Sequence, residues 1–298
     1  MRERDFHGYG GVSPTIDWGG GRNVAVALVL NYEEGAEESV LDGDGRSEGL
    51  LTDAGTSLLA EGRRDLAAES MFEFGSRVGV WRLLEMFDQY DVSATVSAAA
   101  KALERNELLA AHLRNSSHVV QAHGHRWSKQ FEMDGDRERL EIASALTSLE
   151  KTLGYKPKGW MCRYGPSVST RDILLEHDCI HYHSDSYADE IPFWDGGGKR
   201  PILVIPHSFA NNDNKYAKGW FSGPEDYFCW HRAALDQLRR EGAGAKLLTL
   251  SLHCRLSGHA ARADGLRRFL DYAAQCGDVA FLTRDRIFEI WNDAYPAA

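Results

Sequence analysis

The sequence lacks the features of an exported, membrane-spanning or disulfide-stabilised protein. Its five cysteines, at positions 162, 179, 229, 254 and 276, include no Cys-x-x-Cys pair, so neither a disulfide framework nor a structural zinc site follows from their spacing. The first residues contain no apolar core of a signal peptide, and no run approaches the ~18 apolar residues of a membrane span. We therefore expect a cytoplasmic protein with reduced thiols and no membrane partner.

Basic residues are also few relative to acidic ones. The chain has 34 Lys and Arg against 44 Asp and Glu, which gives a net charge of −10. Phosphate backbones are poor partners for such a surface, so we expect no nucleic acid. The motifs of several rival chemistries are missing too, among them a Walker loop, a Gly-x-Ser-x-Gly elbow and a dinucleotide-binding Gly-x-Gly-x-x-Gly in the right setting. We expect a small-molecule substrate and no organic cofactor.

What the sequence does contain is a regular alternation of strand and helix patterns. Val24 to Leu30 has no polar residue, which predicts a parallel strand buried on both faces. Further strands are predicted at 93–97, 118–122, 159–163, 180–183, 202–206, 246–252 and 279–282, with helices such as 78–90, 137–153, 224–240 and 258–275 between them. This order predicts one α/β domain over 1–298 with a parallel sheet or barrel of about seven strands, and the glycine-rich residues 1–22 as an N-terminal arm.

Polar residues gather where the predicted strands end. Because the carboxyl ends of parallel strands meet at one mouth of a barrel, such residues can form an active site there. Carboxylate and imidazole groups act as base and acid on water, or bind a divalent metal that activates it. One such residue alone is more often structural, so it is their shared position that predicts a hydrolytic site. The residues are Glu33 with Glu34, His123 with His125, Arg163, Asp185 with Asp189, and His253.

The order of these motifs resembles the polysaccharide deacetylase superfamily, and most closely its allantoinase and cyclic-imide hydrolase branch. The resemblance implies a distorted (β/α) barrel, hydrolysis of carbon-nitrogen bonds other than peptide bonds, and a homo-oligomer. The matching stretches are Arg4-Asp-Phe-His-Gly-Tyr-Gly, Leu30-Asn-Tyr-Glu-Glu-Gly35, Ala122-His-Gly-His-Arg-Trp127, Asp185-Ser-Tyr-Ala-Asp189, Asn212-Asp213 and Leu252-His-Cys-Arg-Leu256.

The resemblance also implies roles for individual residues. Glu33 takes the position of the family's base, and His253 that of its general acid. Arg163 falls where the family places the arginine that orients the base, and Asp185 or Asp189 would tune the histidine. Four further residues of the matching stretches are expected to contact the substrate, namely Tyr32, Trp127, Asn212 and Asp213.

The sequence leaves a bound metal open. Glu34 occupies the position of the family's metal-ligating acid, and His123 that of its first ligating histidine. The family's second histidine, four residues further on, is replaced here by Trp127, so His125 is the alternative ligand. If a divalent metal is bound, zinc is the expected ion.

Three functions are compatible with this pattern. The first is the opening of a small cyclic amide, such as an allantoin, hydantoin or imide ring. The second is metal-dependent de-N-acetylation of a polysaccharide or peptidoglycan fragment, which belongs to carbohydrate metabolism and requires an open groove. The third is a barrel that has lost catalysis and only binds, and its support is the missing second histidine.

Overall fold

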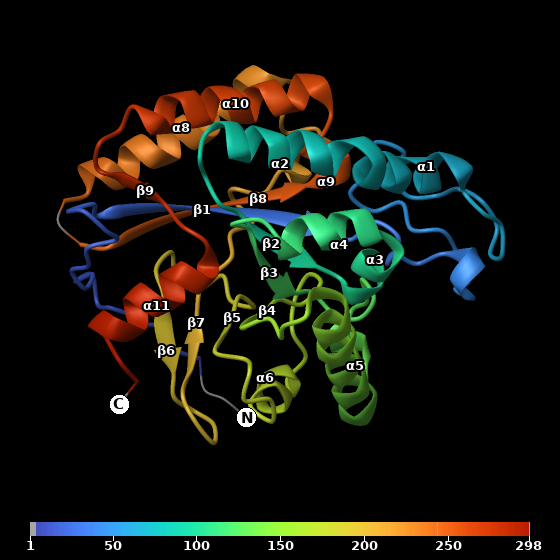
Figure 1. The fold of residues 1–298 in the computed structure, drawn as a ribbon, viewed down its shortest axis with the longest axis horizontal. Coiled ribbons are helices and arrows are strands. Elements are labelled where there is room, and N and C mark those ends of the chain that lie inside the picture. Colours follow the sequence, from blue (N-terminus) through green and yellow to red (C-terminus); the bar gives the residue numbers. More distant parts are fainter. Residues whose placement is uncertain (1–3, 243, 298) are drawn as a thin grey trace.

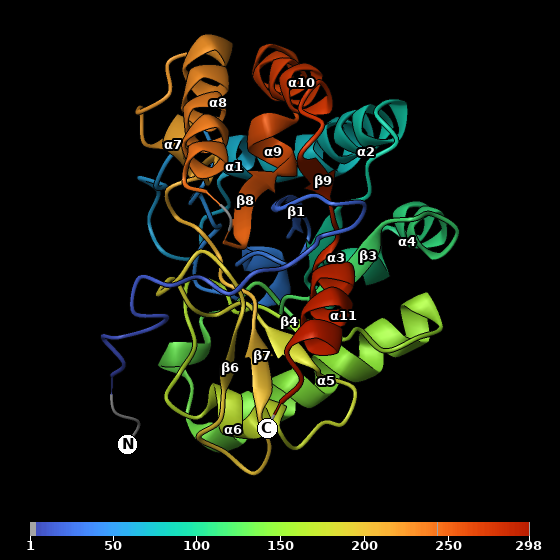
Figure 2. The ribbon, with the colours of Figure 1, turned by 90° about the vertical axis from the view of Figure 1, so that its left-hand side faces the viewer.

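The computed structural model describes residues 4–242 and 244–297, and its centre is a curled sheet with helices around it (Figure 1, Figure 2). The strands lie in the order β6-β7-β5-β4-β3-β2-β1-β8, and β9 pairs with β1. Their bounds are β1 Val24–Tyr32, β2 Thr95–Ala98, β3 Val119–Ala122, β4 Gly159–Trp160, β5 Tyr182–His183, β6 Phe193–Asp195, β7 Ile202–Val204, β8 Lys246–His253 and β9 Val279–Phe281.

Within the described residues, β8, β1, β2, β3, β4, β5 and β7 form a run of seven parallel strands, and β6 is antiparallel to β7. An isolated parallel bridge between Asn212 and Ser251 joins the chain that follows β7 to β8. The sheet therefore curls toward closure at the carboxyl ends of its strands. The predicted distorted α/β barrel of about seven strands is confirmed.

Helices cover the outside of the curled sheet. In Figure 1, α2, α8 and α10 lie over β1 and β8, whereas α5 and α6 lie beside β3 to β5. No helix in the described part of the chain is long and apolar enough to cross a bilayer. The α-helices are α1 Leu66–Phe74, α2 Val80–Gln89, α3 Ala100–Arg105, α4 Glu107–Arg114, α5 Gly135–Leu153, α6 Thr170–Leu174, α7 Asn214–Ala217, α8 Pro224–Arg240, α9 Cys254–Ser257, α10 Ala260–Ala274 and α11 Arg284–Ala294.

Local sequence signals explain where several helices begin and end. The side chains of Asp65, Asp134 and Thr283 accept hydrogen bonds from the first turns of α1, α5 and α11. Gly154 ends α5 with a φ of 82°, a conformation that suits glycine. Pro224 occupies the first turn of α8, where its missing N–H costs no hydrogen bond.

The π-helix η2 Gly75–Gly79 links α1 and α2 without a break in helical conformation. A Cβ atom at Gly75 would overlap the Glu34 carboxylate, and one at Gly79 would overlap the Cys254 carbonyl. The two glycines therefore let this helix approach the ends of β1 and β8 closely. π-Turns inside α-helices are frequent near functional sites, and this one lies against the acidic end of β1.

Residues 4–22 contain no helix or strand and lie against the last helix. Trp18 is buried and stacks on Trp291 of α11, with 6.2 Å between the ring centroids. The Tyr9 hydroxyl donates to the carbonyl of Pro192, 2.5 Å away, just before β6. These contacts hold the N-terminal residues against α11 and the start of β6.

Candidate active site

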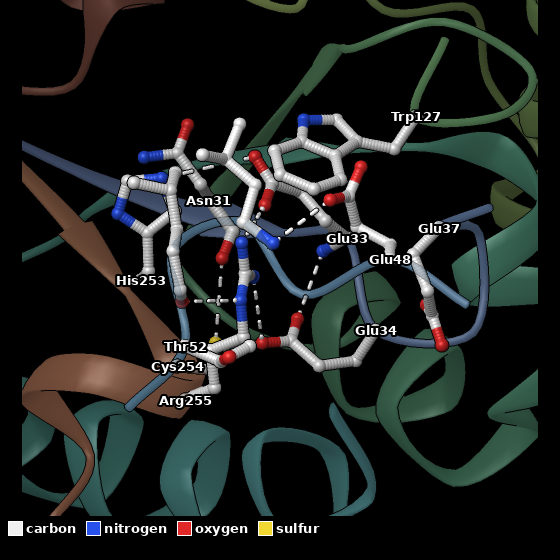
Figure 3. Close-up of polar contacts among 12 residues, drawn as sticks. Asn31, Glu33, Glu34, Glu37, Glu48, Thr52, Trp127, His253, Cys254 and Arg255 are labelled. Carbon is white, nitrogen blue, oxygen red and sulfur yellow. Dashed lines mark hydrogen bonds and ion pairs between the residues drawn. The ribbon is translucent and has the colours of Figure 1, made fainter. Parts of the chain in front are cut away.

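Glu33 is the carboxylate that the end of β1 directs into the barrel. Side chains alternate across a strand, so Asn31 and Glu33 face inward while Tyr32 and Glu34 face outward. Glu33 is 1% exposed, with Oε2 2.7 Å from Nη2 of Arg255 (Figure 3). Its Oε1 lies 3.2 Å from Nε2 of His123. Burial alone would raise its pKa, but Arg255, His253 and His123 together hold the pKa of Glu33 well below its usual range. Glu33 is therefore ionised at neutral pH.

His253, the last residue of β8, lies across from Glu33 with 3.8 Å between Nε2 and Oε1. Its Nδ1 donates to Oδ1 of Asp213 at 2.6 Å, and its backbone N–H donates to Oδ2 at 2.7 Å. Although burial lowers it, the carboxylates of Asp213 and Glu33 raise the pKa of His253 above the ordinary histidine value. The two carboxylates thus favour the protonated form of the imidazole beside Glu33.

The partner of His253 differs from the expectation. Asp213 takes this place, so the prediction that Asp185 or Asp189 pairs with the histidine is wrong. Asp185 instead accepts the backbone N–H of Cys162 at 2.6 Å, and burial raises its pKa to about 6. Asp189 accepts the backbone N–H groups of the two residues that follow it. The bridge between Asn212 and Ser251, two residues before His253, brings Asp213 into reach.

Arg255 was not among the predicted site residues. It is 0% exposed, and its guanidinium lies between two carboxylates, with Nη2 2.7 Å from Oε2 of Glu33 and Nη1 3.4 Å from Oε1 of Glu34 (Figure 3). Its Nε donates to the carbonyl of Leu51 at 2.9 Å. Burial lowers the pKa of Arg255, but the two carboxylates more than reverse this and raise it above its ordinary value.

Arg163 was expected to orient the base, and this prediction is wrong because its guanidinium faces other partners. It stacks on the Trp127 ring at 3.7 Å, donates to the Trp127 carbonyl at 2.7 Å and forms an ion pair with Glu48. The short strand β4 ends before Arg163, and Tyr164 next to it has a φ of 66°. This turn directs Arg163 to the loop over the pocket, away from Glu33.

The three expected metal ligands, Glu34, His123 and His125, do not converge. Glu34 faces away from His123 and packs against Gly75 of η2, where it binds Arg255 and accepts the backbone N–H of Glu33 at 2.8 Å. His125 points outward because Gly124, with a φ of 87°, ends the extended conformation of β3, and its Nε2 lies 3.7 Å from Glu104. The donor set at the mouth of the barrel therefore does not fit a metal, since a guanidinium occupies the space between the acids.

Another group in the described residues could hold a metal. Ligand atoms of Asp88, His112 and His118 lie within 4.8 Å of one another, beside the amino-terminal end of β3 and away from the pocket. Nδ1 of His118 accepts the backbone N–H of Ala94 at 3.0 Å, so the proton of the neutral ring is on Nε2, the atom that faces Asp88 at 3.4 Å. A metal at Nε2 would have to displace this proton.

A pocket of about 260 Å³ opens above Glu33 at the carboxyl end of the strands. Trp127 and Asn212, for which substrate contacts are predicted, line it, and Arg163 forms part of its wall. Tyr32 is outside the lining because it faces outward, where its hydroxyl bonds Ser76 and Asn106 at 2.8 and 3.0 Å, so its expected substrate contact is not supported by the geometry. The lining residues are Asn31, Glu33, Leu50, Leu51, His123, Trp127, Met161, Cys162, Arg163, Tyr164, Tyr187, His207, Phe209, Asn212, Asn214, Lys218 and His253.

Two residues of this wall have unusual backbone conformations. Leu51 and Tyr164 have φ values of 57° and 66°, which non-glycine residues rarely adopt. The carbonyl of Leu51 accepts from Arg255, and that of Tyr164 accepts from the Tyr187 hydroxyl at 2.7 Å. Such strain persists where surrounding contacts hold it, and it is concentrated at functional sites.

Comparison with known proteins identifies the family of this chain. The family model described as polysaccharide deacetylase matches residues 63–177. A Schizosaccharomyces pombe protein provisionally named a polysaccharide deacetylase is 30% identical over 317 aligned positions, which cover 98% of each chain. The chain therefore belongs to the polysaccharide deacetylase family, and the protein is an amidohydrolase of that superfamily.

Two solved structures match over the full length of both chains. PuuE allantoinase has a TM-score of 0.95 at 34% sequence identity. A Pseudomonas aeruginosa PAO1 protein provisionally named a polysaccharide deacetylase also has a TM-score of 0.95, at 36% identity. The resemblance to the allantoinase-like branch, first based on sequence motifs, is confirmed.

Proposed function

We propose that this protein opens a small cyclic amide, of the hydantoin, ureide or imide type, by hydrolysing a carbon-nitrogen bond of the ring. The observation that carries the proposal is an ionised Glu33 facing His253 at the floor of a pocket of about 260 Å³, where the carboxylates of Asp213 and Glu33 raise the pKa of the histidine. Drug-sized ligands occupy pockets of roughly 300–1,000 Å³. A pocket this small suits a single planar ring better than a polymer.

The proposed reaction begins when Glu33 removes a proton from water as the water oxygen bonds to the ring carbonyl carbon. The carbonyl oxygen becomes an oxyanion in the tetrahedral intermediate. When that intermediate collapses, the ring carbon-nitrogen bond breaks and His253 gives its Nε2 proton to the leaving nitrogen. The product is an open-chain carboxylic acid, and the enzyme returns to its starting state when Glu33 loses the proton it took from water and His253 regains one, with solvent as the carrier. Each acid-base contact of this kind contributes typically 10²–10⁴-fold in rate.

Arg255 has a supporting part in this proposal. Its guanidinium keeps Glu33 ionised and, with the Leu51 carbonyl, fixes the direction of the carboxylate. Asp213 does the same for His253, because its carboxylate stabilises the imidazolium and orients it through Nδ1. These contacts are made entirely by this chain's own residues, so the proposed steps involve no metal.

De-N-acetylation of a carbohydrate is the second candidate. It is favoured by the names of the two relatives from Schizosaccharomyces pombe and Pseudomonas aeruginosa, which are similar to this chain along almost its whole length. The acid and base would be the same, but the scissile amide would be an exocyclic acetamide. The substrate would then have to reach Glu33 through the pocket mouth beside Tyr164 and Phe209, which are 72% and 42% exposed.

A substrate panel tests the two candidates together. Purified protein is incubated with allantoin, hydantoins and succinimide, and separately with N-acetylated chito-oligosaccharides and peptidoglycan fragments. Ring opening that is lost in Glu33→Gln, with an unchanged circular dichroism spectrum, supports the proposal. Release of acetate without ring opening would replace it with the second candidate, and full activity of Glu33→Gln would overturn the assigned base.

A further inference from the structure

Arg284 is a buried cation inside the barrel that the proposed reaction does not use. It is the first residue of α11 and is 0% exposed. Its backbone N–H donates to Oγ1 of Thr95 at 2.8 Å, and its Nη1 donates to Oε1 of Gln121 at 2.9 Å. No carboxylate among the described residues forms an ion pair with it. Burial lowers the pKa of Arg284 to about 10, so it still carries its charge at neutral pH.

The guanidinium also contacts the Met161 sulfur, 3.8 Å from Nη1, and His207, which follows β7. Nη2 of Arg284 lies 3.1 Å from Nδ1 of His207. Arginine has donors and no acceptor, so Nδ1 must accept this hydrogen bond and carry no proton. The proton of the neutral ring is therefore on Nε2. Burial, Arg284, His253 and His123 all lower the pKa of His207 well below its ordinary value, which keeps the ring neutral.

His207 is held in this orientation from several sides. Its backbone N–H donates to the carbonyl of Ser186 at 2.9 Å, and the ring of Tyr187 meets its edge with 6.1 Å between centroids. The residue lines the pocket together with Glu33 and His253. Because Nδ1 is turned toward Arg284 in the barrel interior, the protonated Nε2 on the far side of the ring is available to a ligand in the pocket.

From this arrangement we propose that the Nε2–H group of His207 donates a hydrogen bond to the substrate carbonyl oxygen, and that Arg284 is the positioning residue that fixes the required tautomer. This inference rests on the proposed function, in which that oxygen becomes an oxyanion. A neutral N–H donor with a buried cation behind it is polarised toward donation, and it cannot compete with His253 as an acid. Hydrogen bonds of this kind strengthen as negative charge develops on the oxygen.

The tautomer is tested without any substrate. Two-bond proton-nitrogen correlation spectra of the ¹⁵N-labelled protein report the protonation of each imidazole nitrogen, and the signals of His207 are identified by their loss in His207→Gln. We expect Nδ1 to be unprotonated and Nε2 protonated from pH 5 to pH 8. The groups facing the ring are Arg284 from α11, His253 from β8, His123 after β3 and Tyr187 after β5, with Asp185 acting on Arg284. A proton on Nδ1, or titration near the ordinary value, would overturn the inference.

The carbonyl contact is tested by kinetics of ring opening. His207→Phe removes the donor and should lower kcat by about 10²–10³-fold with little change in KM, whereas His207→Gln keeps an N–H donor and should retain more activity. In Arg284→Met the tautomer of His207 is no longer fixed. The neutral ring can then carry its proton on Nδ1, so a new loss of activity should appear as the pH rises through the ordinary histidine range and the imidazolium, which has both N–H donors, is lost. Equal kcat for the wild type and His207→Phe would contradict the carbonyl contact.

The two measurements separate this inference from the proposed function. If the protein opens no cyclic amide, the proposed function fails and the carbonyl contact fails with it, although the spectra can still establish the tautomer. If ring opening occurs and His207→Phe is fully active, only the role of His207 fails. Arg284→Lys is the matched control, because it keeps a buried cation able to donate to Nδ1.

Discussion

Two arginines are fully buried near the pocket, and they differ in what balances their charge. Arg255 lies between Glu33 and Glu34, and its pKa is raised above the ordinary value. Arg284 has an amide oxygen, an imidazole nitrogen and the Met161 sulfur as its acceptors, and burial lowers its pKa. The first arginine holds the buried Glu33 ionised, whereas the second has no carboxylate ion-pair partner among the described residues and helps to keep His207 neutral. Arginine thus keeps the base Glu33 ionised at one place and fixes the neutral donor His207 at another.

Replacing each arginine by methionine should give the largest contrast. Arg255→Met leaves the buried Glu33 and Glu34 without their cation, and breaking such a pair costs about 3–5 kcal/mol. Arg284→Met removes a cation that has no carboxylate partner, so its cost in unfolding free energy should be much smaller. Urea unfolding of both variants measures the difference. Equal destabilisation would show that the two environments are electrostatically alike, and Arg255→Lys serves as the charge-conserving control.

Asp213→Asn should produce the next largest effect, on the pH dependence of activity. The carboxylates of Asp213 and Glu33 raise the pKa of His253, so the protonated acid is present below that pKa and is lost as the pH rises through it. Without the charge of Asp213 the pKa falls, and the alkaline limit of kcat moves to lower pH. Above neutral pH we expect a loss of about 10²-fold. An alkaline limit that does not move would exclude His253 as the acid.

Gly75→Ala tests how much the close packing of Glu34 against η2 contributes to stability. A Cβ atom there would overlap Glu34, which should be pushed from Arg255 at a cost of about 1–3 kcal/mol, typical of overpacking. The matched control is Gly277→Ala, because nothing lies within 4 Å of the added Cβ atom at that position. Thermal unfolding compares the two variants. If Gly75→Ala were as stable as the control, the close packing of Glu34 against η2 would not be required.

Chelation should have the smallest effect. Because Arg255 occupies the space between Glu33 and Glu34, we expect ring opening to be unchanged after dialysis against EDTA. Metal content of the same sample is measured by mass spectrometry of the digested protein. A loss of activity that zinc restores would mean that a metal takes part in the reaction.

Much of the fold was predictable because it depends on local patterns. The helix predicted over 224–240 is α8, and the strand predicted over 246–252 is β8, which extends one residue further. The hydrophobic periodicity of a short stretch of sequence is enough to define such elements. The strand predicted over 159–163 is only two residues long as β4. The chain then turns toward Tyr164, whose φ is 66°, and hydrophobic periodicity does not reveal such a turn.

The site was predictable only where a strand end marked it. The meeting of Glu33, His123 and His253 followed from that rule, and the same rule would have found His207, which directly follows the strand predicted over 202–206. Arg255 was within a matching motif, but its partner Glu33 lies 222 positions away in the sequence. No local signal distinguishes Arg284, because its importance comes from what three distant strands and their loops place around it.

The glycines of η2 also determine which parts of the pocket can change during evolution or engineering. At Gly79 and Gly258 even a methyl group would overlap the backbone around Cys254, the residue that precedes Arg255. The wall that carries the charges is thus intolerant of substitution. The opposite rim, with Leu50, Tyr164 and Phe209 exposed to solvent, has room for larger or smaller side chains. New substrate preferences should therefore be selected by randomising that rim while the charged floor is left intact.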